Sequence, residues 1–263
     1  MMATSPMIAA VSMVKDEPII DHTIRHLLAE GISLVLVADN STDDTADLLA
    51  RLATEQPGVV EVRPVHQGPP PDYPQSAVMT ALAAEAGARG AEWIIPFDAD
   101  EIWHSIDRTR TLADTFATQD PGTGVLVAGV WEHVPQPDDP IHTPPDPFRS
   151  MVHRRPELWA WEKVAFRAQP GVTVWRGSHG VTPEPGRRID GQVAIRHFPY
   201  RTPEQAATKL NRTDQLHAGL ADPAIGIHVR EAVEQVRARG FAAWWDTTMA
   251  RDGLVYDPAP VQP

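Results

Sequence analysis

Residues 93–97 form a short apolar run that stops abruptly at three carboxylates, those of Asp98, Asp100 and Glu101. A uniformly apolar run of this length is typical of a strand that is buried on both faces of an α/β sheet. Open α/β sheets bind their ligands at the carboxyl ends of such strands. The run therefore predicts a buried strand that ends in an acidic, ligand-facing segment.

Asp98 and Asp100 are two positions apart, so in an extended chain their side chains point the same way. Two convergent carboxylates offer the hard oxygen ligands that Mg²⁺ and Mn²⁺ prefer, and both ions also bind substrate phosphates. The pattern predicts a metal site at this position. An acidic loop that caps the following helix is the other interpretation.

The N-terminal part of the chain alternates short apolar runs with segments of helical periodicity. In the first of these segments Ile20, Ile24 and Leu27 recur at the spacing of one helix face. The expected strands cover residues 8–11, 34–37, 59–65 and 93–97, with a helix between each pair. This alternation predicts an α/β fold, with a mostly parallel sheet flanked by helices and joined by right-handed crossovers.

Composition excludes several classes of function. With 263 residues the chain has enough length for one large domain with a sizeable core. A net charge of -12 argues against nucleic acid or an anionic membrane as a partner. The absence of cysteine rules out disulfides and thiol catalysis and fits a reducing compartment, so we expect a cytoplasmic protein. Neither a signal peptide nor a transmembrane segment is expected, because the longest apolar run, residues 32–38, has only the length of a strand.

Three polar motifs follow three of the expected strands. They are Lys-Asp-Glu at 15–17, Asp-Asn-Ser-Thr-Asp-Asp-Thr at 39–45 and Asp-Ala-Asp-Glu at 98–101. In this order and spacing they resemble the family 2 glycosyltransferases of the GT-A fold, over residues 7–105. The resemblance is closest to a subgroup in which Glu follows the Asp-Ala-Asp. It implies a metal-dependent, inverting transfer of a sugar from a nucleotide diphosphate sugar, with a UDP-sugar favoured, to a hydroxyl or amine acceptor.

The resemblance assigns roles at the nucleotide end of the site. Ser12 and Val14 match positions that contact the base, and Asp39 matches the residue that hydrogen-bonds the base, commonly uracil. Asp39 can also cap the next helix. Gln75 stands where a base-contacting Arg or Lys is usual, and residues 67–75 lack the usual basic, glycine-rich character, so the identity of the nucleotide stays open. The expected donor-binding residues are Ser12, Val14, Lys15, Glu17, Asp39, Gln75, Asp98, Ala99, Asp100 and Arg201.

By the same resemblance, Asp98 faces the ribose or the metal and Asp100 ligates the metal on the diphosphate. Glu101 either supports these ligands or is the first acidic residue of a helix. Residues 177–180 resemble the Gly-x-His-Gly of the subgroup, so His179 is the expected third ligand. His197 competes with it, and a purely structural role for His179 stays open.

The second half of the chain carries fewer motifs. A helix is expected over residues 109–118, and strands over 124–131, 164–167 and 172–175. Residues 135–147 are rich in proline and predict a long exposed loop, either a lid or acceptor loop or a solvated insertion. The expected organisation is a GT-A domain over 1–202, with a nucleotide-binding half at about 7–105 and an acceptor half at about 106–202. A helical extension over 203–263 is expected to pack on this domain and to offer a homodimer contact.

A transferase must remove the acceptor's proton, which calls for a carboxylate within reach. Glu162 is the first candidate because it follows two tryptophans at the start of a strand, and Glu132 and Asp190 are the alternatives. Trp103, Trp159 and Trp161 are expected in loops near the site, where aromatic faces can stack on sugars or pack at an interface. Arg201 and Lys209 offer cations for the diphosphate, or are merely charges on a helix.

Two other functions use similar residues. A nucleotidyltransferase would share the sheet and the paired carboxylates, but it should carry a Gly- and Arg-rich phosphate loop where this chain has Ser-Met-Val-Lys at 12–15. A sugar-nucleotide-binding protein without chemistry would have no need for the intact Asp98 and Asp100 pair.

Overall fold

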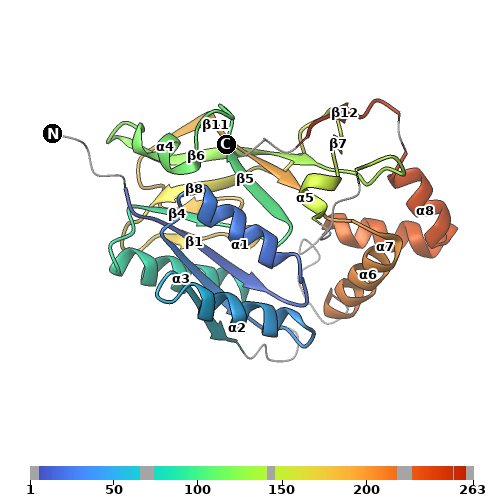
Figure 1. Cartoon of the computed structure of the whole chain (residues 1–263), viewed down its shortest axis with the longest axis horizontal. Coiled ribbons are helices and arrows are strands. Elements are labelled where there is room, and N and C mark those ends of the chain that lie inside the picture. Colours follow the sequence, from blue (N-terminus) through green and yellow to red (C-terminus); the bar gives the residue numbers. More distant parts are fainter. Residues whose placement is uncertain (1–5, 66–73, 141–145, 218–226, 251, 259–263) are drawn as a thin grey trace. The chain divides into compact units, whose positions relative to one another are not determined.

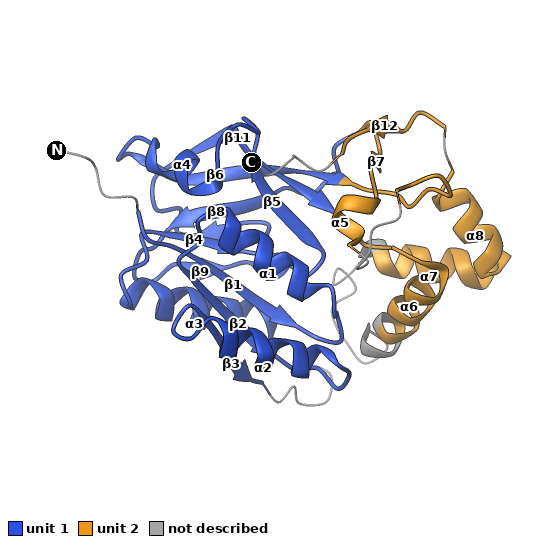
Figure 2. Ribbon diagram, in the orientation of Figure 1, with its two compact units in different colours: residues 1–66, 74–131, 158–197 blue, residues 67–73, 132–157, 198–263 orange. Residues whose placement is uncertain are grey.

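The computed structural model describes residues 6–65, 74–140, 146–217, 227–250 and 252–258. These residues group into two compact units (Figure 2), each of which is described by itself. The first unit contains residues 6–65, 74–131 and 158–197, and the second contains 132–140, 146–157 and the described residues from 198 onward. Residues 132–157 thus group with the C-terminal helices, although they lie well before the boundary that the sequence predicted at residue 202.

The largest sheet of the first unit contains eight strands of the described residues, in the order β3-β2-β1-β4-β8-β6-β11-β5 (Figure 1). They are β1 (Ile8–Val14), β2 (Leu34–Asp39), β3 (Val60–Pro64), β4 (Trp93–Pro96), β5 (Glu101–Ser105), β6 (Thr123–Glu132), β8 (Lys163–Arg167) and β11 (Arg187–His197). Strand β1 pairs in parallel with β2 and β4, and β2 with β3. Beyond β4, strand β8 pairs antiparallel with β4 and β6, and β11 pairs antiparallel with β5. The predicted α/β fold is confirmed, and its parallel part is the half that the alternating pattern covers.

Helices connect the parallel strands and return the chain to the edge of the sheet at which the next strand begins. They are α1 (Ile20–Ala29), α2 (Thr45–Glu55) and α3 (Gln75–Ala88), whereas α4 (Leu112–Ala117) lies between β5 and β6 in the chain. The chain moves from β1 outward to β2 and β3, and then returns through α3 to β4 on the other side of β1. The order of the strands therefore reverses between the paired strands β1 and β4, which makes this position a topological switch point. Open α/β sheets bind ligands at such a point, at the carboxyl ends of their strands.

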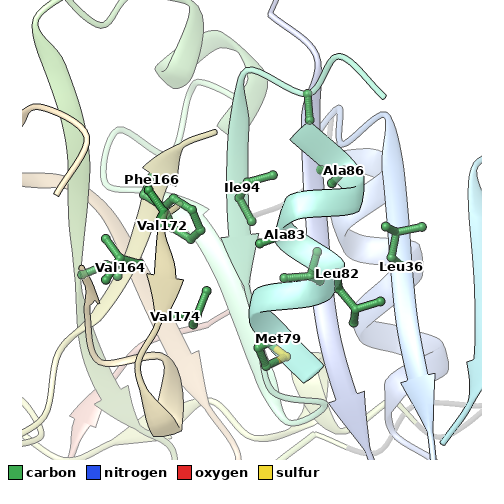
Figure 3. Packing of buried hydrophobic residues seen from close by; sticks show 14 of the residues in the cluster. Leu36, Met79, Leu82, Ala83, Ala86, Ile94, Val164, Phe166, Val172 and Val174 are labelled. Carbon is green, nitrogen blue, oxygen red and sulfur yellow. The ribbon is translucent and has the colours of Figure 1, made fainter. Parts of the chain in front are cut away.

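Helix α3 covers one face of this parallel half (Figure 3). Its alanine-rich sequence favours a helix and lets the backbone approach the strands closely. Met79, Leu82, Ala83 and Ala86 pack in one buried cluster with strand residues such as Ile94 of β4. Burying a side chain such as that of Leu82 stabilises the fold by about 1.5–3 kcal/mol. This packing holds the strand whose end carries the acidic residues.

His104 of β5 is a buried histidine that no sequence motif singled out. Its Nδ1–H donates to the carbonyl oxygen of Ser105 at 2.8 Å, and its Nε2 has no hydrogen-bond partner among the residues that the structure describes. Burial lowers the pKa of His104 from 6.5 to about 4, and the charges of Arg108, Arg196 and His26 act in the same direction. The folded protein therefore keeps this imidazole neutral.

This histidine should make stability sensitive to acid. The unfolded chain binds a proton at His104 below pH 6.5, whereas the folded chain binds it only near pH 4, so stability is lost as the pH falls through this window. Between pH 7.5 and pH 5 the free energy of unfolding should fall by about 2 kcal/mol more in the native protein than in His104→Asn. Urea denaturation followed by tryptophan fluorescence measures both, and equal losses would contradict the assignment.

The second unit is largely helical. Its elements are α5 (Pro147–Ser150), β7 (His153–Arg154), α6 (Pro203–His217), α7 (Ile227–Arg239), α8 (Phe241–Thr248) and β12 (Val255–Tyr256). The apolar residues of these helices, among them Leu210, Val233 and Trp244, bury one another in a small core. Much of the apolar surface of the expected helical extension is thus buried within the unit, and its packing on the GT-A domain or another subunit stays a prediction. None of the helices in the described ranges has the length and apolar character needed to cross a membrane.

The proline-rich segment that was expected as an exposed loop is partly built into the second unit. Gln136 is buried, its side chain donates to the carbonyl oxygen of Met249 at 3.2 Å, and its backbone N–H donates to Asp139 Oδ2 at 2.7 Å. Asp139 also contacts His153 at 2.9 Å. The early part of the segment is therefore anchored, while residues 141–145, including His142, lie outside the described residues.

Candidate functional site

The acidic residues form a tight turn at the carboxyl end of β4. The N–H of Glu101 donates to the carbonyl oxygen of Asp98 at 3.1 Å, and the side chain of Glu101 accepts from the N–H of Asp98 at 3.1 Å. Glu101 then begins strand β5, so the interpretation of this residue as the start of a helix is wrong. The carbonyl oxygen of Ala99 accepts a hydrogen bond from Thr23 of α1, which ties the turn to the first helix. The switch point between β1 and β4 thus ends in a fixed acidic turn.

Lys163 is the residue that sequence reasoning missed. It is the first residue of β8, which runs antiparallel to β4, so it lies beyond the carboxyl end of β4. Its Nζ donates to Asp98 Oδ2 at 2.6 Å and lies 3.0 Å from Glu101 Oε1. The side chains of Lys163 and Glu101 are 2% and 1% exposed, whereas that of Asp98 is 36% exposed. A buried ammonium therefore joins the two ends of the acidic turn.

Burial and the neighbouring charges shift the pKa values of Glu101 and Lys163. Burial and the neighbouring charges of Asp98 and Asp100 raise the pKa of Glu101 from 4.5 to about 7, although the ammonium of Lys163 opposes the rise. Burial disfavours the charged form of Lys163, but the carboxylates of Asp98 and Glu101 outweigh it and raise the pKa of the ammonium. Lys163 is accordingly a permanent cation at the site.

Two histidines and a tryptophan lie beside the acidic turn. His197 Nε2 is 3.8 Å from Asp100 Oδ1, and Nδ1–H of His179 donates to the carbonyl oxygen of Glu162 at 2.8 Å. The ring of Trp159 contacts both, with centroid distances of 6.1 Å to His179 and 5.7 Å to His197. Burial lowers the pKa of His179, and the nearby charge of Lys163 lowers it further, which keeps the ring neutral at neutral pH. The structure therefore brings both predicted histidines to the region of the predicted aspartates.

These residues offer a partial ligand set for a divalent cation. Within the described ranges, no group of three His, Cys, Asp or Glu side chains is arranged to hold a metal ion. His179 is thus not assembled with Asp98 and Asp100 into a three-ligand site, and its role as a ligand stays a prediction. However, Asp98 Oδ1 makes no hydrogen bond to any described residue, and its side chain is one-third exposed. Mg²⁺ is typically held by one or two carboxylates together with substrate phosphates, and the pair fits that mode of binding.

The loops after β1 and β2 are joined at the nucleotide end of the site. Asp16, with a left-handed φ of 50°, donates its N–H to Ser41 Oγ at 2.9 Å and accepts from the N–H of Thr42 at 2.7 Å. Lys15 Nζ donates to the carbonyl oxygen of Asn40 at 3.1 Å. Asp39 accepts from the N–H of Ser41 at 2.9 Å and therefore stabilises its own loop rather than capping the next helix. These hydrogen bonds hold the two loops against each other.

The other predicted donor-binding residues in this region are buried. Ser12 is 0% exposed and Val14 is 3% exposed, because β1 extends to Val14 instead of ending in a polar turn at residue 12. The Ser12 hydroxyl lacks a hydrogen-bond partner within the part of the chain that the structure describes. Glu17 is also buried. Their contacts with a nucleotide stay predictions, and residues 67–73 lie outside the described ranges.

Gln75 holds the loop that carries His179. Its Oε1 accepts a hydrogen bond from the N–H of Gly177 at 3.0 Å, at a turn in which Gly177 and Ser178 are both left-handed, with φ of 69° and 60°. This turn (η1, Arg176–Ser178) lies between the short strands β9 (Thr173–Val174) and β10 (Val181–Thr182). Such backbone conformations persist only where neighbouring contacts hold them. In the structure Gln75 is thus a support for the His179 loop, and its predicted contact with a nucleotide base is not tested.

We expect Gln75→Leu to loosen this turn, because it removes the partly buried hydrogen bond between Gln75 and Gly177. Amide exchange of Gly177 should accelerate about fivefold, the effect of losing a bond worth about 1 kcal/mol. Hydrogen exchange measured on a peptide covering residues 173–182 reports it. Gln119→Leu is the matched control, since the Gln119 amide bonds only within its own helix end, to the carbonyl oxygen of Thr115 at 2.8 Å. Equal exchange in both variants would show that Gln75 does not hold the turn.

The candidate bases are placed very differently. Glu162 is half-exposed, and its carboxylate contacts Arg188, while its carbonyl oxygen holds His179. Asp190 is exposed and lies seven residues from His197 on β11, a distance of about 23 Å at the usual rise of a strand. Glu132 belongs to the second unit, where it pairs with Arg155 at 3.0 Å. Of the two candidates in the first unit, Glu162 is the one brought next to the cluster.

Two further expectations concern side chains outside the acidic turn. Trp103 was expected in a loop, but it is fully buried in β5 and cannot stack on a sugar, whereas Trp161 is 49% exposed and packs against His179. Arg201 belongs to the second unit, and its guanidinium donates to the carbonyl oxygen of Phe198 at 3.1 Å. The structure therefore does not test a contact of Arg201 with a diphosphate.

Comparison with known proteins identifies the first part of the chain. Residues 9–123 match the model of glycosyl transferase family 2, which confirms the predicted resemblance over this segment. Nothing among the curated proteins matches the chain. A solved structure described as mannose-1-phosphate geranyltransferase, from Thermus thermophilus, aligns over 97% of this chain and 74% of its own, with 12% sequence identity and a TM-score of 0.31. A likeness this weak carries no inference about fold or activity.

Proposed function

We propose that this protein, whose residues 9–123 match glycosyl transferase family 2, transfers a sugar from a nucleotide diphosphate sugar to a hydroxyl or amine acceptor. The observation that supports it best is the acidic turn 98–101, which follows β4 at the topological switch point and lies within the matched segment. The loops after β1 and β2 begin at the same edge of the sheet as this turn, because β1, β2 and β4 are parallel. This is where a nucleotide bound by an open α/β sheet would lie.

In the proposed reaction the acceptor oxygen or nitrogen attacks the anomeric carbon from the side opposite the nucleotide. The bond to the diphosphate breaks as the new glycosidic bond forms, so the configuration inverts. The acceptor's proton passes to a carboxylate, for which Glu162 is our candidate. The electron pair of the bond between the anomeric carbon and the diphosphate oxygen leaves with the diphosphate. The site must stabilise the negative charge that develops there.

Asp98 and Asp100 would hold the divalent cation, Mn²⁺ or Mg²⁺, together with the diphosphate oxygens. When bound, such a cation neutralises the charge that develops on the leaving group. The protein's own contribution is to fix the turn through Glu101 and Thr23, and to present Asp98 with one unbonded oxygen. His179 and His197 are the candidates for a third ligand from the chain.

A thermal-shift screen tests this function. The protein is heated with UDP, GDP, CDP, ADP or TDP, each with and without Mn²⁺, and we expect at least one diphosphate to stabilise it only when the metal is present. The matching sugar nucleotide should then be hydrolysed slowly in the absence of an acceptor. If no diphosphate stabilises the protein under either condition, the proposed function is wrong.

The acceptor and the oligomeric state are further parts of the proposal. Exposed Trp161, beside His179, offers a surface on which an acceptor sugar can stack.

A homodimer through the C-terminal helices stays a prediction. Light scattering during size-exclusion chromatography measures the mass that decides it.

A further inference from the structure

Lys163 is an unusual residue to find in the interior of this sheet. Its side chain is 2% exposed, and its ammonium contacts two carboxylates, Asp98 at 2.6 Å and Glu101 at 3.0 Å. Removing charges from water is so costly that well-packed apolar side chains often serve stability equally well. A buried ion pair is thus weak evidence for a stabilising role, and a role in the site is the better explanation.

The position of Lys163 supports such a role. The two carboxylate oxygens of Asp98 differ in their contacts. Oδ2 accepts a hydrogen bond from the ammonium of Lys163, while Oδ1 makes no hydrogen bond to any residue that the structure describes. Lys163 also follows Glu162, whose carbonyl oxygen holds the ring of His179. One strand end therefore connects the carboxylate turn with the histidine loop.

We propose that Lys163 is a positioning residue that serves as a fixed internal cation of the donor site. Its charge makes the carboxylate cluster less negative by one, so that an anionic diphosphate can approach together with its cation. This inference rests on the proposed function. It adds a role for a residue that neither the sequence motifs nor the family match assigns.

The charge of Lys163 has a consequence that a purely structural role does not share. Removing the ammonium makes the cluster more negative, so a bare divalent cation should bind more tightly while the anionic metal–diphosphate complex should bind more weakly. Even when screened as strongly as in bulk water, one unit charge about 6 Å from a divalent cation changes its affinity by about tenfold, and we take this as the expected size of both effects. A variant that merely disturbs the turn would weaken both.

The experiment uses the full-length protein, four variants at Lys163 and Glu101, and one control variant. Lys163→Met removes the charge and Lys163→Arg keeps it. The double variant Lys163→Met/Glu101→Gln is compared with Glu101→Gln, so that the ammonium is removed while the side chain at position 101 stays neutral. Arg167→Met is the matched control, because it removes a cation from the other end of the same strand, where Arg167 lies over the ring of Trp93. Electron paramagnetic resonance measures the binding of Mn²⁺ alone. Calorimetry in saturating Mn²⁺ measures the binding of whichever of UDP, GDP or ADP binds the native protein best.

For Lys163→Met we expect about tenfold tighter Mn²⁺ binding and about tenfold weaker diphosphate binding. Lys163→Arg and Arg167→Met should remain within about threefold of the native protein. The double variant should differ from Glu101→Gln in the same two directions as Lys163→Met differs from the native protein. Parallel loss of both affinities in Lys163→Met, or no change in either, would overturn the proposal.

If Lys163→Met does not fold, the double variant, which leaves no unpaired buried charge, decides. Compared with Glu101→Gln, tighter Mn²⁺ binding together with weaker diphosphate binding in it supports the role of the charge, and a loss of both overturns it. The failure of the proposed function has a different signature, because the native protein itself would then bind none of the diphosphates. Distinct results therefore separate the two ideas.

Discussion

Asp100→Asn should lower sugar transfer by about 10²–10³-fold while the protein stays folded. The substitution keeps the size of a side chain that is almost fully buried, but it removes the negative charge that faces His197 at 3.8 Å and that we expect to bind the cation on the diphosphate. Losing one preorganised electrostatic group from an active site typically costs this much in rate. Transfer is measured with the sugar nucleotide found by the screen, and folding by thermal denaturation.

Asp190→Asn is the matched control for this substitution. It makes the same chemical change in the same unit, but at the exposed start of β11, about 23 Å along the strand from His197. We expect it to transfer sugar at the native rate. Undiminished transfer by Asp100→Asn would remove Asp100 from the site. Equal losses in both variants would show that the effect is not specific to the acidic turn.

The sequence predicted the parallel half of the sheet well because its signals are local. Each short apolar run became a strand, and each periodic segment became a helix within a few residues, as the helix expected over residues 75–89 shows by forming α3. The carboxyl ends of these strands then had to meet at one edge, which placed Asp98 and Asp100 correctly. The alternating pattern and the rule for ligand position were sufficient for this part.

The antiparallel half was not predictable in the same way, because its pairings join distant segments. Strand β5 begins at Glu101 and pairs with β11, so Glu101 and Trp103 are buried strand residues rather than residues of a helix and a loop. Lys163 comes to Asp98 across 65 positions of the chain. A lysine beside an apolar run is typical of the exposed end of a strand. No local signal reveals that the carboxylates that pair with this lysine follow a different strand.

The other large expected effect concerns the base. Glu162→Gln should lower transfer by about two to four orders of magnitude, the usual range for losing a general base, while affinity for the diphosphate stays near the native value. The carboxylate is half-exposed beside the exposed ring of Trp161, and its backbone holds His179, so it lies where an acceptor could reach it. Glutamine keeps the shape of the side chain but cannot take up the acceptor's proton.

The contact between Glu162 and Arg188 gives this experiment its control. Arg188 also pairs with Glu184 at 3.0 Å, so Glu184→Gln disturbs the same guanidinium without touching the proposed base. We expect Glu184→Gln to transfer at a rate within about threefold of the native protein, because an exposed ion pair contributes little. Comparable losses in the two variants would mean that Arg188, rather than a base, is what the reaction needs. Normal transfer by Glu162→Gln, with a large loss in Glu132→Gln, would move the role to Glu132.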